Sequence, residues 1–398
     1  MLIGLLGKAN VGKSTFFNAA TEQEVEAANY PFTTVKSNLG TANIRVDCVC
    51  REFKVKDNPI HSTCIDGVRF IPIRVLDVPG LVEGAHQGRG LGNRFLDDIR
   101  LADVLIQIID GSGSTDKEGK PVVTGSADPL LDVKLVEDEL DYWILSIVNR
   151  EWSKAIKEAN SRGQKAEQLL SKRLSGLAIK EDTVLEALKE VGLIGKELKN
   201  WQEEDLLRFS KRIRQKGKPI VMVANKADLQ AADEIIVRVK DFKEVIPCSS
   251  EAELLLRRAA KRGILNYIPG DNSFQLVDAQ LSEPQKKALD LVRTVLNRYG
   301  STGIQEAINR ACLDSLDSIV VYPVEDEVKL TDKKGNVLPE ARLLPRNSTV
   351  KDLANQIHED LAKGFLFAID VRTKQRRGSD YKLKDNDVIK IVSTTSRG

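Results

Sequence analysis

The sequence has little of what marks secreted, membrane-spanning or polyanion-binding proteins. Five cysteines in 398 residues do not make a disulfide framework. No apolar run approaches the ~20 residues that span a bilayer, and the start MLIGLLGKANVGKS has neither a charged leader nor a cleavage-site pattern. Sixty basic residues face 58 acidic ones, so the overall charge indicates no polyanionic partner. We therefore expect a cytoplasmic, monomeric protein with no membrane partner.

Short apolar runs alternate with helical patterns, which predicts an α/β fold with a mostly parallel sheet and helices on both faces. A first helix is expected at 14–21. The predicted strands are 1–7, 38–49, 68–78, 104–110, 220–224 and 245–248.

One spacing within this pattern is anomalous. More than 100 residues separate the apolar runs VLIQIID and IVMVA, where one crossover helix would suffice, and apolar residues recur there at helical spacing. We predict a first domain over 1–125 and 216–317, with trailing helices at its end, and an inserted α-helical domain over 126–215. From 318 to 398, short strands flank one helix and predict a small α+β domain.

The segment Gly7 to Ser14 (GKANVGKS) satisfies the pattern GxxxxGK[ST] between a predicted strand and a predicted helix. The backbone N–H groups of such a loop wrap phosphates, and the following helix adds its positive dipole end. Lys13 is expected to reach the β- and γ-phosphates, and the Ser14 hydroxyl to bind Mg²⁺. The nucleotide contacts predicted here come from Asn10, Val11, Gly12, Lys13, Ser14 and Thr15.

Two further motifs follow in the order that a nucleotide switch requires. In Asp77-Val78-Pro79-Gly80, a strand-end Asp belongs near Mg²⁺, and the Gly80 N–H can meet the γ-phosphate. In Asn225-Lys226-Ala227-Asp228, the Asp228 carboxylate can accept both the N1–H and the 2-amino group of guanine. Adenine offers no such donor pair, so this motif favours GTP over ATP.

The remaining base contacts are expected around the next predicted strand. Asn225 would contact the base edge and hold neighbouring loops, while the stem of Lys226 would cover the ring. The sequence Ser249-Ser250-Glu251 follows the strand, and the backbone N–H of Ser250 is the expected donor to guanine O6.

With these motifs in order, the sequence resembles the translation-factor-related GTPases of the Obg superfamily, and its YchF-like branch in particular. The segments NYPFTT (29–34) and GLVEGAHQGRGLGN (80–93) look like that family's two switches. The resemblance implies that Thr34 ligates Mg²⁺ and the γ-phosphate. It covers roughly 1–110, 218–251 and 318–398. Several YchF-like proteins have lost the guanine-reading Asp and accept ATP, whereas Asp228 is intact here.

The C-terminal domain contains the stretches VVYPVEDE, LPRNSTVKDLA and YKLKDNDVIKIV. With them it resembles a TGS domain, a β-grasp fold seen in threonyl-tRNA synthetases, stringent-response enzymes and Obg relatives. A basic cluster in it is either an RNA contact or a solvated turn. This cluster is formed by Arg372, Lys374, Arg376 and Arg377.

A second basic segment lies in the predicted helical insertion. Over 150–218, 17 Lys or Arg residues face 11 Asp or Glu residues, a balance of +6. This excess is either a solvated helix surface or a patch that faces the ribosome or RNA. Its C-terminal cluster contains Arg208, Lys211, Arg212, Arg214, Lys216 and Lys218.

Catalysis is the part of the switch that the motifs specify least. Ras-like switches orient the attacking water with a Gln directly after DxxG, and here that position is Leu81. We expect slow intrinsic hydrolysis until another group orients the water. Glu83, His86 and Gln87 are the candidates for that group. In related GTPases an Asn at this loop position helps to hold K⁺, which adds positive charge against the transition state. The resemblance therefore implies this role for Asn10, and the alternative is that Asn10 only braces its loop. Lys13, Thr34 and Gly80 are the groups expected to act on the γ-phosphate.

Between two predicted strands lie four possible metal ligands: Cys48, Cys50, His61 and Cys64. Three cysteines and one histidine are an accepted structural zinc set, although C-x-C is an unusual spacing for it. A disulfide and unliganded buried thiols are the alternatives.

Two functions remain open from the sequence. One is a GTP-hydrolysing, Mg²⁺-dependent switch that works with the ribosome or RNA through the TGS-like and inserted helical domains. The other is a nucleotide-sensing binding protein whose hydrolysis is incidental. A metabolic ATP-dependent kinase is disfavoured by the NKAD motif.

Overall fold

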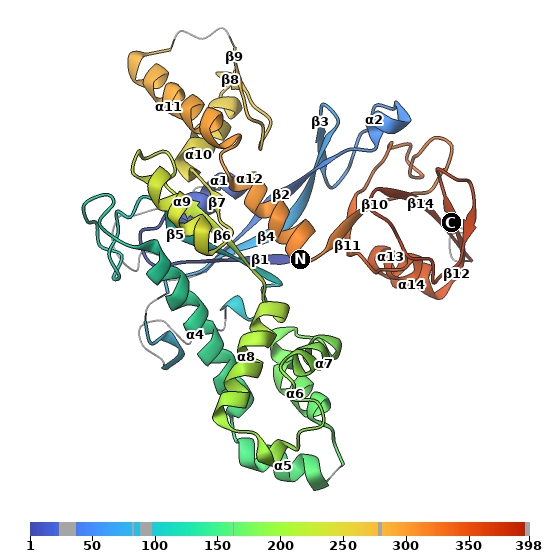
Figure 1. The fold of residues 1–398 in the computed structure, drawn as a ribbon. Coiled ribbons are helices and arrows are strands. Elements are labelled where there is room, and N and C mark those ends of the chain that lie inside the picture. Colours follow the sequence, from blue (N-terminus) through green and yellow to red (C-terminus); the bar gives the residue numbers. More distant parts are fainter. Residues whose placement is uncertain (24–36, 82, 88–97, 162, 278–280, 395–398) are drawn as a thin grey trace. The chain divides into compact units, whose positions relative to one another are not determined.

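The computed structural model describes residues 1–23, 37–81, 83–87, 98–161, 163–277 and 281–394. They divide into two compact units (Figure 1). The first unit comprises Met1–Ala42 and Arg74–Ala307, and the second comprises Asn43–Ile73 and Ile308–Gly398. This division differs from the one expected above, since 43–73 group with the C-terminal residues. The boundaries at 125, 215 and 317 remain a prediction.

The larger sheet is mostly parallel, and its strands follow the order β2-β4-β1-β5-β6-β7, with β1, β5, β6 and β7 lying wholly in the first unit. β1 pairs in parallel with β4 and β5, and β6 pairs in parallel with β5 and β7, while the short β3 adds antiparallel to β4. All seven residues of β5 are buried, as expected for a strand covered on both faces. The strands are β1 (Leu2–Leu6), β2 (Asn38–Asp47), β3 (Thr63–Ile65), β4 (Val68–Asp77), β5 (Val104–Asp110), β6 (Ile220–Asn225) and β7 (Ile246–Pro247).

This topology positions the predicted site. Because β1, β4, β5 and β6 are parallel, their carboxyl ends meet at one edge of the sheet, where α/β proteins bind ligands. Gly7, Asp77, Asp110 and Asn225 lie at these ends. The helices and the small hairpin of this part are α1 (Lys13–Thr21), α9 (Ala232–Phe242), α10 (Ser250–Lys261), β8 (Leu265–Asn266), β9 (Gln275–Leu276), α11 (Glu283–Tyr299) and α12 (Ile304–Asn309).

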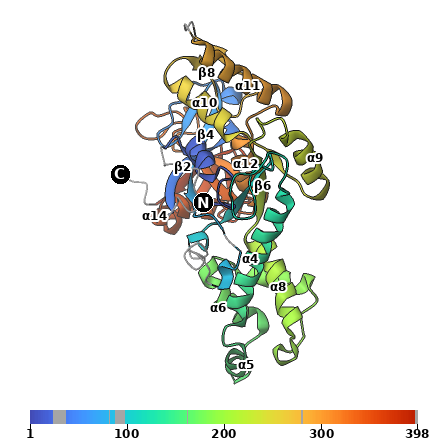
Figure 2. The same ribbon diagram turned by 90° about the vertical axis from the view of Figure 1, so that its left-hand side faces the viewer.

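The segment between β5 and β6 is helical, as predicted. Its two longest helices, α4 and α8, run side by side away from the sheet, and α5 lies at their far end (Figures 1 and 2). A buried ion pair of 2.5 Å joins Asp141 of α4 to Arg214 of α8. The helices are α4 (Pro129–Asn149), α5 (Trp152–Ser161), α6 (Ala166–Leu174), α7 (Glu181–Glu190) and α8 (Glu203–Gly217).

The core of these helices is continuous with the core beside the sheet. Leu140 and Ile144 of α4 belong to the same buried apolar cluster as Leu6, Val78 and Leu81. The inserted helices therefore share packing with the segments that carry the phosphate-binding motifs, and burial of this shared apolar surface favours a fixed contact.

The basic cluster of the insertion is largely neutralised within the protein. Arg214 is buried on Asp141, and the buried Lys218 donates to the Arg100 and Ala102 carbonyls. Arg208 forms an ion pair with Asp205. Lys216 forms ion pairs with Glu186 and Glu190. Most of this cluster is thus internal or paired surface structure.

The second unit contains a five-stranded sheet of order β11-β10-β14-β12-β13, in which β10 and β14 pair in parallel and the other pairs are antiparallel. The Thr349 hydroxyl caps α13 by accepting from the Asp352 N–H. Its elements are α2 (Cys50–Phe53), β10 (Ser318–Val324), β11 (Arg342–Pro345), α13 (Val350–Ile357), α14 (Glu359–Lys363), β12 (Phe365–Asp370), β13 (Arg376–Arg377) and β14 (Asp387–Ser393).

The segment 43–73 contributes to the core of this second unit. Val49 and Ile71 are buried in one cluster with Val320, Tyr322 and Leu338. This packing across some 250 residues of sequence explains why the segment groups with the C-terminal sheet. None of the helices in the described residues is long and apolar enough to cross a membrane.

Candidate nucleotide site

The phosphate loop joins β1 to α1 and is held by the second predicted motif. Gly12 has a φ of 92°, and a Cβ there would lie 2.2 Å from Asn225 Nδ2. Asn225 Nδ2 donates to the Val11 carbonyl at 2.9 Å. Only glycine fits this approach, because any side chain would displace Asn225 and would be strained at that φ. Thr15 lies in the first turn of α1.

Lys13 is buried at the start of α1. Its ammonium donates to the Lys8 carbonyl at 2.8 Å. Burial lowers the pKa of Lys13 to about 8, an effect that the negative charge of Asp77 opposes. Phosphate oxygens would supply the negative charge that such a buried ammonium lacks.

Ser14 and Asp77 lie together at the predicted Mg²⁺ position. The Ser14 hydroxyl donates to Asp77 Oδ2 at 3.1 Å, and Asp77 is fully buried at the end of β4. Burial raises the pKa of Asp77, whereas the charge of Lys13 and the Ser14 hydroxyl lower it. Its Oδ1 is buried without a hydrogen-bond partner among the described residues. Hard oxygen donors of this kind fit a divalent cation. Thr34, the third expected ligand, lies outside the described residues.

Gly80 and Leu81 approach the phosphate loop from the end of β4. A Cβ on Gly80 would lie 3.1 Å from the Ala9 backbone nitrogen, and the Leu81 N–H donates to the Gly7 carbonyl at 3.1 Å. The Leu81 side chain is 3% exposed and packs in the apolar core with Val78. Leu81 therefore replaces the expected Gln with a core residue rather than with another polar group.

Of the three candidates for activating water, His86 is held by the helical insertion. Its Nδ1 lies 2.7 Å from Glu139 Oε2 on α4, and its ring stacks on Tyr142 at 5.1 Å. Glu83 and Gln87 lie on either side of it in the same segment. Residues 82 and 88–93 of the second switch-like stretch lie outside the described residues.

The base-reading motif and the two serines after β7 form a hydrogen-bonded cluster, the base corner, which contains Asn225, Asp228, Ser249 and Ser250. Asp228 Oδ1 accepts from the Ser249 hydroxyl at 2.7 Å. Asn225 Oδ1 accepts from both the N–H and the hydroxyl of Ser250, at 3.0 and 2.9 Å. The Ser250 N–H, which the sequence predicts as the donor to guanine O6, donates to Asn225 in this structure, and its contact with the base stays a prediction. Glu251 lies in the first turn of α10.

Lys226 is anchored beside the base corner. It has a φ of 65°, and its ammonium lies 2.9 Å from Asp110 Oδ2 and 3.0 Å from the Ser114 hydroxyl. Burial acts to raise the pKa of Asp110, but Lys226 and the surrounding hydroxyls lower it below its usual range. A cavity of about 460 Å³ adjoins the corner at Asp228 and Ser249, with otherwise mostly apolar walls from α10 and α11.

Sequence reasoning missed the segment after β5 as part of this site. Asn10 Nδ2 donates to the Gly119 carbonyl at 2.8 Å, and Lys8 pairs with Asp132 at 2.8 Å and donates to the Thr115 carbonyl at 2.9 Å. Burial raises the pKa of Asp132 to about 6, although Lys8 lowers it. The sequence signal for these contacts is Lys8, a second lysine in GKANVGKS, but the sequence does not indicate which residues Lys8 contacts.

Comparisons with known proteins agree with this arrangement along the chain. Residues 2–137 match the family described as "50S ribosome-binding GTPase". Residues 223–326 match "Obg-like GTPase YGR210-like, G4 motif-containing domain", and residues 329–393 match the TGS domain.

Among similar proteins, an uncharacterized GTP-binding protein of Methanocaldococcus jannaschii is 49% identical over 98% of this chain and 99% of its own length. One of Schizosaccharomyces pombe is 34% identical over 82% of each chain. The ribosome-binding ATPase YchF of Mycoplasma pneumoniae is also 34% identical, over 58% of each.

Two solved structures resemble the whole chain. A GTP binding protein from Pyrococcus horikoshii OT3 has a TM-score of 0.78 at 40% identity, covering 99% of this chain and 100% of that one. The Schizosaccharomyces pombe YchF GTPase has a TM-score of 0.55 at 17% identity, covering 98% and 97%, and shows the fold alone. The predicted fold class is confirmed: a mostly parallel P-loop domain with a helical region and a C-terminal TGS domain.

Proposed function

This chain belongs to the Obg-like, YchF-type family of GTPases, and we propose that it is a slow, Mg²⁺-dependent GTP switch that works with the ribosome or with RNA. The observation that carries guanine selectivity is the Asp228 carboxylate, fixed by Ser249 beside the Asn225 corner. Several relatives are named ATPases, as is the Mycoplasma pneumoniae protein. The nucleotide choice of this chain therefore depends on its own residues.

Calorimetric titration of the wild-type chain tests the base preference. We expect GTP to bind at least ~100-fold more tightly than ATP, since a site built to hydrogen-bond a base rejects one that lacks the donors. Equal affinities for GTP and ATP would overturn guanine selectivity.

Mg²⁺ would be held through Ser14, Asp77 and Thr34, and there it would neutralise charge on the β- and γ-phosphates. The buried, unpartnered Asp77 Oδ1 supports this assignment. Lys13 would hold the phosphates, and the Gly80 N–H would meet the γ-phosphate only when GTP is bound. The ordering of Thr34 and Gly80 by GTP, and their release on hydrolysis, is how such switches change state.

The slow hydrolysis that we propose is explained by two residues that follow Gly80. Leu81 is buried in the core and cannot orient water, and His86 is engaged by Glu139. We propose that a partner or K⁺ completes the site. In this structure the Asn10 amide braces Gly119, and K⁺ would add a second role for the Asn10 side chain.

Support for a ribosomal partner comes from the TGS domain and from the names of similar proteins. The test is sedimentation of cell extract with GDP or with a non-hydrolysable GTP analogue. We expect the chain to move with ribosomes in a nucleotide-dependent way. Identical sedimentation in both nucleotides, away from ribosomes, would contradict the proposal.

The second candidate function is a nucleotide-sensing binding protein whose hydrolysis is incidental, and the buried Leu81 favours keeping it. Thr34→Ala separates the two. If nucleotide sensing is the function, this variant loses partner binding; if hydrolysis is the function, it loses GTPase rate while binding persists.

A further inference from the structure

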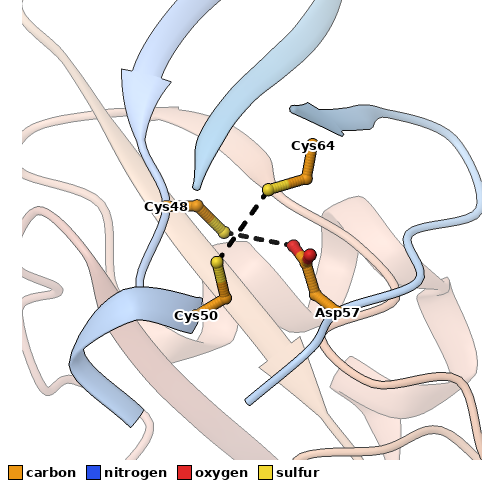
Figure 3. Close-up of side chains that lie close together, drawn as sticks. All are labelled: Cys48, Cys50, Asp57 and Cys64. Atoms are coloured by element: carbon orange, nitrogen blue, oxygen red, sulfur yellow. Dashed lines mark hydrogen bonds between the residues drawn. The ribbon is translucent and has the colours of Figure 1, made fainter. Parts of the chain in front are cut away.

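We propose that Cys48, Cys50, Cys64 and Asp57 bind one zinc ion in the second unit. Figure 3 shows the three sulfur atoms and the carboxylate converging from the end of β2, the start of α2, β3 and the segment between them. Their ligand atoms all lie within 4.8 Å of one another. Cys48 and Cys50 are buried, and the other two side chains are half-buried.

The spacing of these atoms fits a tetrahedral ion better than a disulfide. Zn–S bonds of 2.3 Å place tetrahedral sulfur neighbours ~3.8 Å apart, and a sulfur and an oxygen ~3.6 Å apart. Cys50 and Cys64 have their sulfur atoms 3.9 Å apart, and Cys48 Sγ lies 3.3 Å from Asp57 Oδ2. A disulfide needs sulfur atoms about 2.05 Å apart, and it would leave the third thiol of the cluster unpaired.

The ligand set differs from the one predicted from the sequence. His61 lies outside the cluster, because its side chain is 73% exposed and its Nδ1 lies 2.8 Å from Glu340 Oε1. Asp57 stands in its place. A carboxylate is an accepted zinc ligand beside thiolates.

Arg69 gives this set the outer contacts that metal ligands need. Its fully buried guanidinium donates to Asp57 Oδ2 at 2.7 Å and to Cys48 Sγ at 3.4 Å, and it is fixed by Ser62 and the Leu338 carbonyl. Three thiolates, a carboxylate and Zn²⁺ together carry a charge of −2, which is costly to bury. Arg69 reduces this to −1 and orients two of the ligands.

The zinc would fasten a segment that has little regular structure of its own. Cys48 to Cys64 contains one short helix and the beginning of β3, yet it packs on Tyr322 and Leu338 in the core of the second unit. Small regions that cannot build a sufficient core often rely on such a metal. The ion would thereby stabilise the attachment of this segment to the TGS sheet.

The test uses the full chain, reduced, incubated with zinc chloride and desalted. Elemental analysis is expected to give one zinc per chain, released by a thiol-specific mercurial. The cobalt-loaded chain is expected to show the intense visible absorption of tetrahedral thiolate coordination. The proposal would be overturned by less than about a tenth of a zinc ion per chain or by an octahedral cobalt spectrum. It would also be overturned if mass spectrometry without reductant gave a mass two hydrogens lower, which indicates a disulfide.

Matched variants assign the ligands. Cys64→Ser is expected to lose the stoichiometric ion, and Asp57→Asn to weaken zinc affinity by at least ~10-fold. His61→Ala and Cys312→Ser, which change a histidine and a cysteine outside the cluster, are expected to keep both stoichiometry and affinity. Loss of zinc in His61→Ala with retention in Asp57→Asn would overturn the ligand set. Since the wild-type measurements need no variant to fold, they decide the proposal alone.

Discussion

Glu139 of α4 is a hydrogen-bond acceptor for the segment that follows DVPG, and His86 is its main partner. The carboxylate accepts from the backbone N–H groups of His86 and Gly84 at 2.8 and 2.6 Å, and its Oε2 lies 2.7 Å from His86 Nδ1. Glu139 is 4% exposed. The inserted helices are thereby joined to the stretch expected to respond to the γ-phosphate.

Replacing this carboxylate should destabilise the nucleotide-free protein. Glu139→Ala leaves two N–H groups without their acceptor, that of the buried Gly84 and that of the half-buried His86. We expect a loss of roughly 2–3 kcal/mol in the free energy of unfolding. Glu139→Gln should recover part of the loss, because its amide oxygen can still accept. Asp138→Ala, which removes a neighbouring carboxylate that makes none of these bonds, is the control in a urea titration. Equal midpoints for the Asp138 and Glu139 alanine variants would refute the role of Glu139.

The pKa of Lys13 predicts a pH dependence. Its ordinary value of 10.5 falls to about 8 in the nucleotide-free fold. Between these values the unfolded chain holds more protons, so the stability contribution of Lys13 rises as the pH increases from about 8 to 10.5. Below pH 8 the folded state bears the full cost of a buried ammonium, about 3 kcal/mol.

Lys13→Met, which keeps the length without the charge, should therefore be more stable than the wild type at pH 7 when no nucleotide is bound. The gap should narrow as the pH rises above 8. Chemical unfolding at several pH values measures it, with circular dichroism as a check on the fold. A gap that stays constant from pH 7 to 10 would contradict the assigned cause. At every pH the variant should bind GTP far more weakly than the wild type.

Potassium dependence is expected at Asn10. A transition state with charge spread over the phosphate oxygens needs added positive charge, and K⁺ held by Asn10 and switch backbone carbonyls would supply it. Hydrolysis should be faster in KCl than in NaCl at equal ionic strength. Asn10→Ala should remove this difference and leave GTP affinity nearly unchanged, since Lys13 and Ser14 remain. Equal rates in the two salts, with and without ribosomes, would leave Asn10 as the brace of Gly119 alone.

The parts of the site that the sequence predicts well are those set by local pattern. GKANVGKS, Asp77 and Asn225 each follow a buried apolar run, and parallel pairing brings the ends of these runs to one sheet edge. The helical insertion could be predicted in the same way, from the excess length between β5 and β6. Hydrophobic periodicity and segment length predict these features without any knowledge of distant contacts.

What could not be predicted depends on contacts between distant residues. Asp57 rather than His61 lies in the cysteine cluster, and Arg69 donates both to the Asp57 carboxylate and to the distant Leu338 carbonyl. The Ser250 N–H is used by Asn225, 25 positions away. In each case the contact is made with a residue distant in the sequence, and no local pattern predicts that partner.

The base corner offers the most direct test of the account. Asp228→Asn keeps the size of the side chain and replaces one acceptor oxygen with a donor. Calorimetric titration should then show GTP affinity reduced at least ~100-fold and xanthosine triphosphate binding improved, because its 2-oxo group accepts where guanine's 2-amino group donates. Asp241→Asn, which changes an exposed carboxylate on α9, should leave both affinities unchanged. Undiminished GTP affinity in the Asp228 variant would contradict the central claim that this chain reads guanine.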